Sequence, residues 1–186
     1  MIPADTLEGR LLLALPGMPD PRFAHSVIAL CVHNAEGALG IGIGAELAEV
    51  RLHDLLRDLG IDPGAAPNVA VLSGGPVEPQ RGFVLHTPDW HSGGTMARGQ
   101  EWSLTGSRDI LEAIAAGTGP AQWLIALGYA GWSAGQLDEE MRHHGWYAAQ
   151  SRPQVVFATP AKSRWTAAWK SEGIDPALLA NVTGHA

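Results

Sequence analysis

Residues 74–86 read GGPVEPQRGFVLH, and this stretch decides how we expect the rest of the chain to fold. A short apolar run, 69–72, precedes it, and a second apolar run, 82–86, ends it. Because glycine and proline interrupt regular structure, the pattern predicts a strand, a Gly-Gly-Pro corner and a second strand. The corner carries Glu78 and Arg81, so polar side chains are placed on a stiff turn between two core strands.

Other short apolar runs predict further strands. They cover residues 26–33, 101–104, 122–129 and 155–158. The segment EGALGIGIG also alternates with a period of two, which on a strand puts Gly40, Gly42 and Gly44 on one face and two isoleucines on the other. A face without side chains allows another backbone to approach closely, which is the favoured interpretation; the alternative is that a ligand occupies this face. The glycine spacing matches neither the dinucleotide fingerprint nor the P-loop pattern.

Helices are predicted where apolar residues recur at helical spacing or where capping residues stand. The leucine pattern predicts a helix over 46–59, and another is expected over 108–116 with Ile110, Leu111 and Ile114 facing inward. Further helices are expected from 133 to about 145, through the tryptophans after Thr159–Pro160, and as short turns after Asp20–Pro21 and Asp175–Pro176.

The helix start near Ser133 carries two recognised signals. Gln136 stands three residues after Ser133, which predicts a capping box, and Trp132 with Leu137 predicts a hydrophobic staple. By contrast, residues 87–100 are rich in glycine and polar side chains and are predicted to form the longest irregular loop.

Strands and helices interleave irregularly, which predicts an α+β fold rather than a regular βαβ series. A length of 186 residues predicts a single domain spanning 1–186, large enough to bury a core without disulfides. The 12 Lys and Arg residues against 19 Asp and Glu residues give a formal net charge of −7, and the chain has no basic run. Direct nucleic-acid binding is therefore disfavoured, because it depends on neutralising phosphates with an excess of cations.

We expect a cytoplasmic protein that does not enter the membrane. No run approaches the roughly 20 apolar residues that span a bilayer, and the first residues lack the basic start of a signal peptide. Cys31 is the single cysteine, so an internal disulfide is excluded. Its apolar surroundings favour a buried small hydrophobe, and a reactive thiol is the alternative.

Recognised catalytic and metal-binding motifs are missing, and we expect neither a metal nor a cofactor. The chain has no H-E-x-x-H, no C-x-x-C and no G-x-S-x-G motif. His143 and His144 are adjacent on a predicted helix, so their side chains point about 100° apart and are poorly placed to chelate one ion. Ser133 is better explained as a helix cap than as a nucleophile.

One set of polar and aromatic side chains forms the candidate binding surface. Its members lie at the ends of predicted strands, on the Gly-Gly-Pro corner and at the start of the helix near residue 133. They are Asp20, Arg22, His33, Glu36, Glu78, Arg81, His86, Trp132 and Gln136. If the loops cluster, these residues make one rim of mixed charge; the alternative is that each only caps or ties its own loop.

Several long stretches resemble the AlgH/YqgE family of small bacterial proteins. The resemblance runs nearly end to end and includes residues 9–40, 74–86, 107–117 and 124–146 and the closing GHA. It implies an α+β fold in which a sheet partly rolls into a barrel with helices around it. It supplies no reaction, because the family has no established catalytic residues, and some members carry the label of transcriptional regulator.

Two functions follow from these observations. The first is a binding or regulatory module that acts through a protein partner or a small ligand, since catalytic motifs are missing and long loops carry tryptophans. The second is an enzyme whose active site lies among the loop residues around the Gly-Gly-Pro corner. A pocket shared by His33, Glu36 and Arg81 would favour the enzyme.

Overall fold

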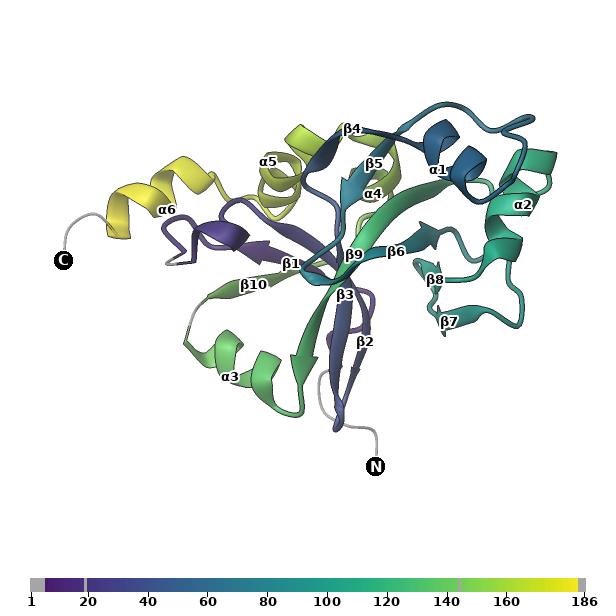
Figure 1. Cartoon of the computed structure of the whole chain (residues 1–186). Coiled ribbons are helices and arrows are strands. Elements are labelled where there is room, and N and C mark those ends of the chain that lie inside the picture. Colours follow the sequence, from purple (N-terminus) through teal and green to yellow (C-terminus); the bar gives the residue numbers. More distant parts are fainter. Residues whose placement is uncertain (1–5, 19, 144, 184–186) are drawn as a thin grey trace.

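A curled, mixed β-sheet with helices packed on it forms the fold (Figure 1). The structure, a computed structural model, describes residues 6–18, 20–143 and 145–183. Within these residues the strands follow the order β10-β1-β2-β3-β9-β6-β8-β7, and β5 and β4 join beside β9. The strands are β1 (Leu11–Ala14), β2 (Val27–Asn34), β3 (Gly37–Gly42), β4 (Glu46–Arg51), β5 (Ala70–Ser73), β6 (Val77–His86), β7 (Thr95–Arg98), β8 (Ser103–Thr105), β9 (Trp123–Ser133) and β10 (Trp146–Ala149). The helices are η1 (Pro21–Phe23), α1 (Leu52–Asp58), α2 (Arg108–Ala116), α3 (Gln136–Arg142), α4 (Pro153–Ala158), α5 (Ala161–Ser171) and α6 (Pro176–Thr183). The predicted α+β, partly barrel-like architecture is confirmed, and the closing GHA lies outside the described residues.

Strand β9 joins the two halves of the sheet. It pairs with β6 along one edge, and on the other edge it pairs with β5 in parallel and then with β3 in antiparallel orientation. Ala126, for example, is opposite both Phe83 of β6 and Leu72 of β5. The predicted corner therefore does not form a hairpin of two paired strands; instead, it wraps from one edge of β9 to the other.

Four glycines allow this wrapping, and we call them the glycine junction: Gly42, Gly74, Gly75 and Gly128. A Cβ atom on Gly74 would lie 2.2 Å from the carbonyl oxygen of Gly128, and one on Gly75 would lie 2.1 Å from the carbonyl carbon of Tyr129. Gly75 and Gly128 also have φ angles of +151° and +77°, which side chains disfavour. The N–H of Gly42 donates to the carbonyl of Gly74 at 2.7 Å, so the predicted close approach of a second backbone is confirmed there.

Helices cover both faces of the sheet, which explains why consecutive residues of β1 are all buried. Leu11 and Leu13 face a core closed by α4 and α5, whereas Leu12 and Ala14 face a core closed by α3. A third core lies under α1 and α2, where the predicted inward residues of α2 are all buried. Figure 1 shows α3 at one end of the molecule and α1 with α2 at the other.

The predicted helix over 46–59 is wrong in its first half. Residues 46–51 form β4, which pairs with β5, and only residues 52–58 are helical. Glu49 has a φ of +66° and interrupts the ladder between Glu46 and Arg51. This irregular strand carries leucine and valine at spacings that also fit a helix. The spacing of the apolar residues therefore did not distinguish a strand from a helix.

The predicted strand over 155–158 is also wrong, because these residues belong to α4. Pro153 occupies the first turn of that helix, where its missing N–H costs nothing. A run of four apolar residues is too short to separate a strand from a buried helix. Strand β10, which pairs with β1, was not predicted.

Two smaller predictions need correction. The expected irregular loop over 87–100 contains β7, which pairs with β8. The helix expected from Ser133 begins later, with Gly135 at its N-cap, so the capping box is incomplete. One of its bonds is present, from the N–H of Ser133 to Oε1 of Gln136 at 3.0 Å, and Trp132 and Leu137 share one core cluster, as a staple requires.

The glycine junction generates a stability prediction. Gly75→Ala is expected to lower the free energy of unfolding by about 3–5 kcal/mol, because the added methyl group meets the β9 backbone and the φ angle is strained. Gly60→Ala is the control, because the φ of Gly60 is +72° but nothing lies within 4 Å of the added atom. The expected loss in the free energy of unfolding is about 1–2 kcal/mol, from the backbone conformation alone. Urea unfolding measures both, and equal losses would contradict the role of the contact.

Candidate functional site

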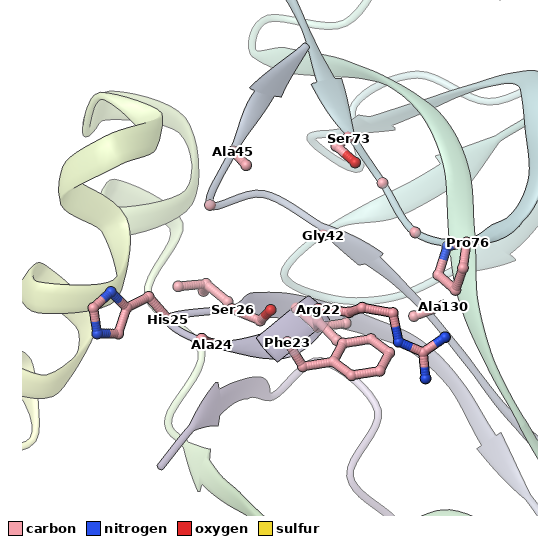
Figure 2. Close-up of a pocket in the computed structure, with 15 residues that line it drawn as sticks. Arg22, Phe23, Ala24, His25, Ser26, Gly42, Ala45, Ser73, Pro76 and Ala130 are labelled. Carbon is pink, nitrogen blue, oxygen red and sulfur yellow. The ribbon is translucent and has the colours of Figure 1, made fainter. Parts of the chain in front are cut away.

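A first cavity, the glycine cleft, lies where η1 and the start of β2 approach the β3–β4 turn and the Gly-Gly-Pro corner. It has a volume of about 370 Å³. Figure 2 shows Ala45 and Ser73 on one side, Ser26 and Phe23 on the opposite side, and Pro76 at one end. The cleft therefore depends on the glycine junction, which holds the corner against β9 and so fixes one of its walls.

Hydrogen-bond donors without acceptors gather in the glycine cleft. Among the described residues, the N–H groups of Gly44 and Gly75 have no acceptor, and the hydroxyl groups of Ser26 and Ser73 have no partner. Ser26, Gly44 and Gly75 are half-buried and Ser73 is exposed, so these groups are accessible from the cleft. Several unpaired groups in one hollow are typical of a site that offers hydrogen bonds to a ligand.

His25 marks one end of the same cleft (Figure 2). Its φ is +58°, a conformation that residues other than glycine seldom adopt and that costs of order 1–3 kcal/mol. The ring lies 4.4 Å from the Trp165 ring, and the indole of Trp165 donates to the carbonyl of Ala14 at 2.9 Å. Stacking on a fixed indole supports this strained backbone at the edge of the cleft.

A second cavity, the tryptophan cleft, adjoins the first and has a volume of about 530 Å³. The two clefts share Arg22, Phe23, Pro76 and Ala130, so η1 forms part of the boundary between them. Aromatic rings at steep angles line the second cleft. Phe23 meets Trp146 at 5.8 Å and 70°, and Trp132 meets Trp146 at 6.4 Å and 81°.

Glu140 holds the aromatic wall in place. Its Oε2 accepts hydrogen bonds from the indole N–H of Trp132 at 2.9 Å and from that of Trp146 at 3.0 Å, while Oε1 accepts from the amide of Gln136 at 3.1 Å. Buried indole N–H groups need an acceptor, and this carboxylate serves both. The tryptophan cleft is thus preorganised by one acidic side chain on α3.

Charges of both signs surround the tryptophan cleft. Arg22 and Asp20 form a forked ion pair with a shortest distance of 2.7 Å, and hydrogen bonding to Arg22 lowers the pKa of Asp20. On the opposite side, Glu139 contacts His143 at 2.8 Å and Arg142 at 3.1 Å, and the hydrogen bond from His143 lowers the pKa of Glu139. These exposed pairs orient side chains and contribute little stability.

The structure brings four of the nine predicted surface residues to one cleft. Asp20, Arg22, Trp132 and Gln136 all line the tryptophan cleft. Asp20 also caps η1 by accepting from the N–H of Arg22 at 3.0 Å, so capping and lining the cleft are compatible roles.

His33, at the end of β2, and Glu36, in the turn between β2 and β3, line neither cleft. His33 contacts Asp138 of α3 at 3.1 Å, and its Nδ1 accepts from the N–H of Leu7. Glu36 borders a shallow depression with Tyr129 and Trp132.

Glu78, Arg81 and His86 do not join either cleft, so the expected single rim is not formed. Arg81 pairs with Glu78 at 3.5 Å and lies over the ring of Phe83 at 4.9 Å. His86 is fully buried and bonds to Thr105. None of the three cavities described above is lined by more than one of His33, Glu36 and Arg81, so the shared pocket that would favour an enzyme is not found among them.

Glu140, Trp146 and the unpaired N–H groups were missed by sequence reasoning. Trp146 lies on β10, a strand that was not predicted, and Glu140 was not singled out as a site residue. A tryptophan six residues after a glutamate on the same helix-to-strand connection is the only local signal, and it is weak. The unpaired N–H groups depend on loop geometry that the sequence does not specify.

Among the described residues, which exclude His144, no group of three His, Cys, Asp or Glu side chains is arranged to hold a metal ion. Cys31 is half-buried, and its thiol lies near the carbonyl of Ala29. Burial raises the pKa of this thiol to about 12, so the interpretation as a small core hydrophobe fits better than a reactive thiol. In the part of the chain that is described, no helix has the length and apolar character to cross a bilayer.

Glu140 yields a prediction about the aromatic wall. Glu140→Ala is expected to lower the free energy of unfolding by about 2–5 kcal/mol, because two indole N–H groups lose their acceptor. Glu140→Gln retains an acceptor oxygen and is expected to cost less than half as much. Urea unfolding and the indole N–H signals in NMR spectra check this, and equal losses in the two variants would contradict it.

His86 yields a prediction about pH. Burial lowers the pKa of His86 from its ordinary value of 6.5 and outweighs the hydrogen bond between Nδ1 and the carbonyl of Thr87, which acts to raise the pKa, so the folded state favours the neutral ring. The unfolded chain takes up the proton first as pH falls, so stability decreases below about pH 6.5 with a slope of up to about 1.4 kcal/mol per pH unit. His86→Gln is expected to flatten this slope between pH 5 and 7, whereas His91→Gln, at an exposed position, keeps it. Unchanged slopes in His86→Gln would contradict the assignment.

Comparisons with known proteins agree with the architecture. A protein from Novosphingobium aromaticivorans, named UPF0301 protein, is 60% identical over the full length of both chains, and one from Rhizorhabdus wittichii is 51% identical over 97% of each. The solution structure of the AlgH protein from Pseudomonas aeruginosa is similar with a TM-score of 0.80 at 38% identity, covering 98% of this chain and 97% of that one. A crystal structure from Corynebacterium diphtheriae, at 19% identity and a TM-score of 0.75, covers 97% of this chain and 94% of that one and supports the fold alone. The family model described as AlgH-like (DUF179) matches residues 11–177, and this chain therefore belongs to the AlgH-like family.

Proposed function

We propose that this chain is a cytoplasmic binding module that takes a small organic ligand in the adjoining glycine and tryptophan clefts. The observation that carries the proposal is the gathering of unpaired donors in the glycine cleft: the N–H groups of Gly44 and Gly75 and the hydroxyls of Ser26 and Ser73. Such donors are satisfied by a ligand with carbonyl, hydroxyl or carboxylate oxygens.

The second cleft supports the same conclusion from its shape and lining. Its aromatic walls are held by Glu140, so they are rigid before any ligand arrives. Ligand sites combine an apolar, aromatic lining with a few placed polar groups, and rigid walls reduce the entropy lost on binding. We expect the apolar or ring portion of the ligand to lie here and its oxygen atoms to face the glycine cleft.

Charge supports a small molecule rather than nucleic acid. The formal net charge of −7 opposes phosphate backbones. Among the described residues that line the two clefts, Arg22 is the single arginine, and its guanidinium group is already paired with the carboxylate of Asp20. A regulatory role then follows as a consequence of ligand binding and needs no direct DNA contact.

A cleft-filling variant tests the proposal. A Cβ atom on Gly44 would lie 3.4 Å from the carbonyl oxygen of His25 and 3.5 Å from the N atom of Val27, so a side chain fits there and extends among cleft residues. Gly44→Leu is expected to leave the fold intact and to block the cleft. The protein is dialysed against a bacterial small-molecule extract, and retained compounds are identified by mass spectrometry. At least one compound is expected to be enriched tenfold or more by the wild type and not by Gly44→Leu.

Gly93→Leu is the matched control, because nothing lies within 4 Å of the added atom and Gly93 lines neither cleft. It is expected to retain the same compounds as the wild type. Failure of the wild type to enrich any compound, or equal enrichment by Gly44→Leu, would contradict the proposal.

A further inference from the structure

Arg164 of α5 is a buried cation with almost no partners. Its exposed fraction is 5%, and its one hydrogen bond runs from Nη1 to the carbonyl of Ile43 at 2.7 Å. Nε is buried without an acceptor, and no carboxylate in the described residues lies within ion-pair distance. A guanidinium group carries five N–H donors, so four have no protein acceptor, and Nε is the nitrogen that is also buried away from solvent.

This arrangement is energetically incomplete. Burial lowers the pKa of Arg164 to about 10, so the group still carries its charge at neutral pH. Buried charges in folded proteins are normally paired and hydrogen-bonded, because an uncompensated charge away from water is costly. Glu46 is the carboxylate whose charge acts on Arg164, but its side chain is exposed and forms no ion pair with it.

The guanidinium lines a cavity that is distinct from the two clefts. This cavity, of about 390 Å³, lies between the start of β9, the residues around β5, and the helices α4 and α5. Apart from Arg164 and Glu46, much of its wall is apolar, with Val69, Trp123 and Phe157 among the lining residues. A cation at one point of an apolar wall favours a ligand with one charged end and an apolar body.

The first turn of α5 adds a second source of positive potential. This helix is 11 residues long and begins at Ala161 after Pro160, and no side chain caps it. Its free N–H groups and the positive end of its dipole attract anions. Ala161 and Pro160 line both the cavity and a neighbouring hollow that contains Lys162, so the cation, the helix end and the lysine are adjacent.

We propose that the cavity at Arg164 binds a small organic anion, whose carboxylate or phosphate head pairs with Arg164 at the start of α5 and whose apolar body lies against β9 and α4. The site is independent of the proposed function, although Gly44 and Ala45 border both the glycine cleft and the hollow at Lys162. The head supplies the acceptors that the protein does not, and Lys162, which lines the neighbouring hollow, adds positive charge nearby.

Four probes separate the contributions of head and body. Hexanoate and hexyl phosphate share a body and differ in the head, hexanol has the same body without charge, and inorganic phosphate is a head alone. Titrations of the full chain at constant ionic strength follow the side-chain N–H signal of Arg164 and the backbone N–H signals of residues 161–163 by NMR. Either hexanoate or hexyl phosphate is expected to bind with a Kd at least tenfold lower than that of hexanol and of inorganic phosphate. The ratio of the Kd of hexanoate to that of hexyl phosphate identifies the preferred head.

Variants assign the binding to Arg164. Arg164→Met removes the charge, keeps the apolar stem and is expected to raise the Kd of the preferred anion at least tenfold. Lys170→Met, an equal loss of charge at an exposed position on the same helix, is expected to leave it unchanged within twofold. Glu46→Gln removes the nearby carboxylate and is expected to lower the Kd at least twofold. If Arg164→Met does not fold, the Kd of Glu46→Gln tests whether the anion binds in this cavity.

The proposal is overturned if hexanol binds as tightly as the better anion, if no probe produces a saturable shift, or if Arg164→Met binds like the wild type. An unchanged Kd in Glu46→Gln also overturns it. Ser26→Leu separates this site from the proposed function, because Ser26 lines the glycine cleft but neither the cavity at Arg164 nor the hollow at Lys162. Filling the glycine cleft from Ser26 is expected to leave binding at Arg164 within twofold of the wild type.

Discussion

The contact of three backbones at the glycine junction is the constraint on which the rest of the structure depends. Strand β9 carries β6 on one edge and β5 with β3 on the other, and the Gly-Gly-Pro corner has to cross it between them. The crossing brings Gly74 and Gly75 so close to Gly128 that no Cβ atom fits on any of them. Since β9 joins both halves of the sheet, widening this contact would separate β3 from the corner and disturb all three cores.

The same constraint produces the glycine cleft. A chain that turns sharply over another backbone cannot pair all of its own N–H groups, because the neighbouring strand is already paired with β6 and β3. Gly75 is left with an unpaired N–H, and so is Gly44 at the opposite turn. Tight packing and unpaired donors are therefore two results of one geometry. Glycine, which the packing requires, also exposes its backbone to whatever occupies the cleft.

The sequence predicted the elements that local signals determine. The corner, the η1 turn capped by Asp20 and the inward face of α2 are local features, and the structure confirms them. It did not predict β4 or β10, since each exists only through pairing with a distant strand. The candidate site shows the same division. Asp20 and Arg22 are two residues apart, and they form the ion pair that such a spacing allows. Arg81 was assigned to the same surface because it follows the Gly-Gly-Pro corner, but its side chain lies over the ring of Phe83 on β6 instead.

Two partly or fully buried ionisable groups show how a structural role differs from a ligand site. Glu140 accepts three hydrogen bonds from Trp132, Trp146 and Gln136, so its polar capacity is largely used within the protein and its removal would leave donors unpaired. Arg164 uses one donor and has no ion pair, so its polar capacity is largely unused. A fold gains little from desolvating a charge and leaving it unpaired, and replacing such a group with an apolar one is often neutral or favourable for stability. A bound anion would compensate the charge of Arg164 and accept hydrogen bonds from its unused donors, which accounts for an arginine in that position.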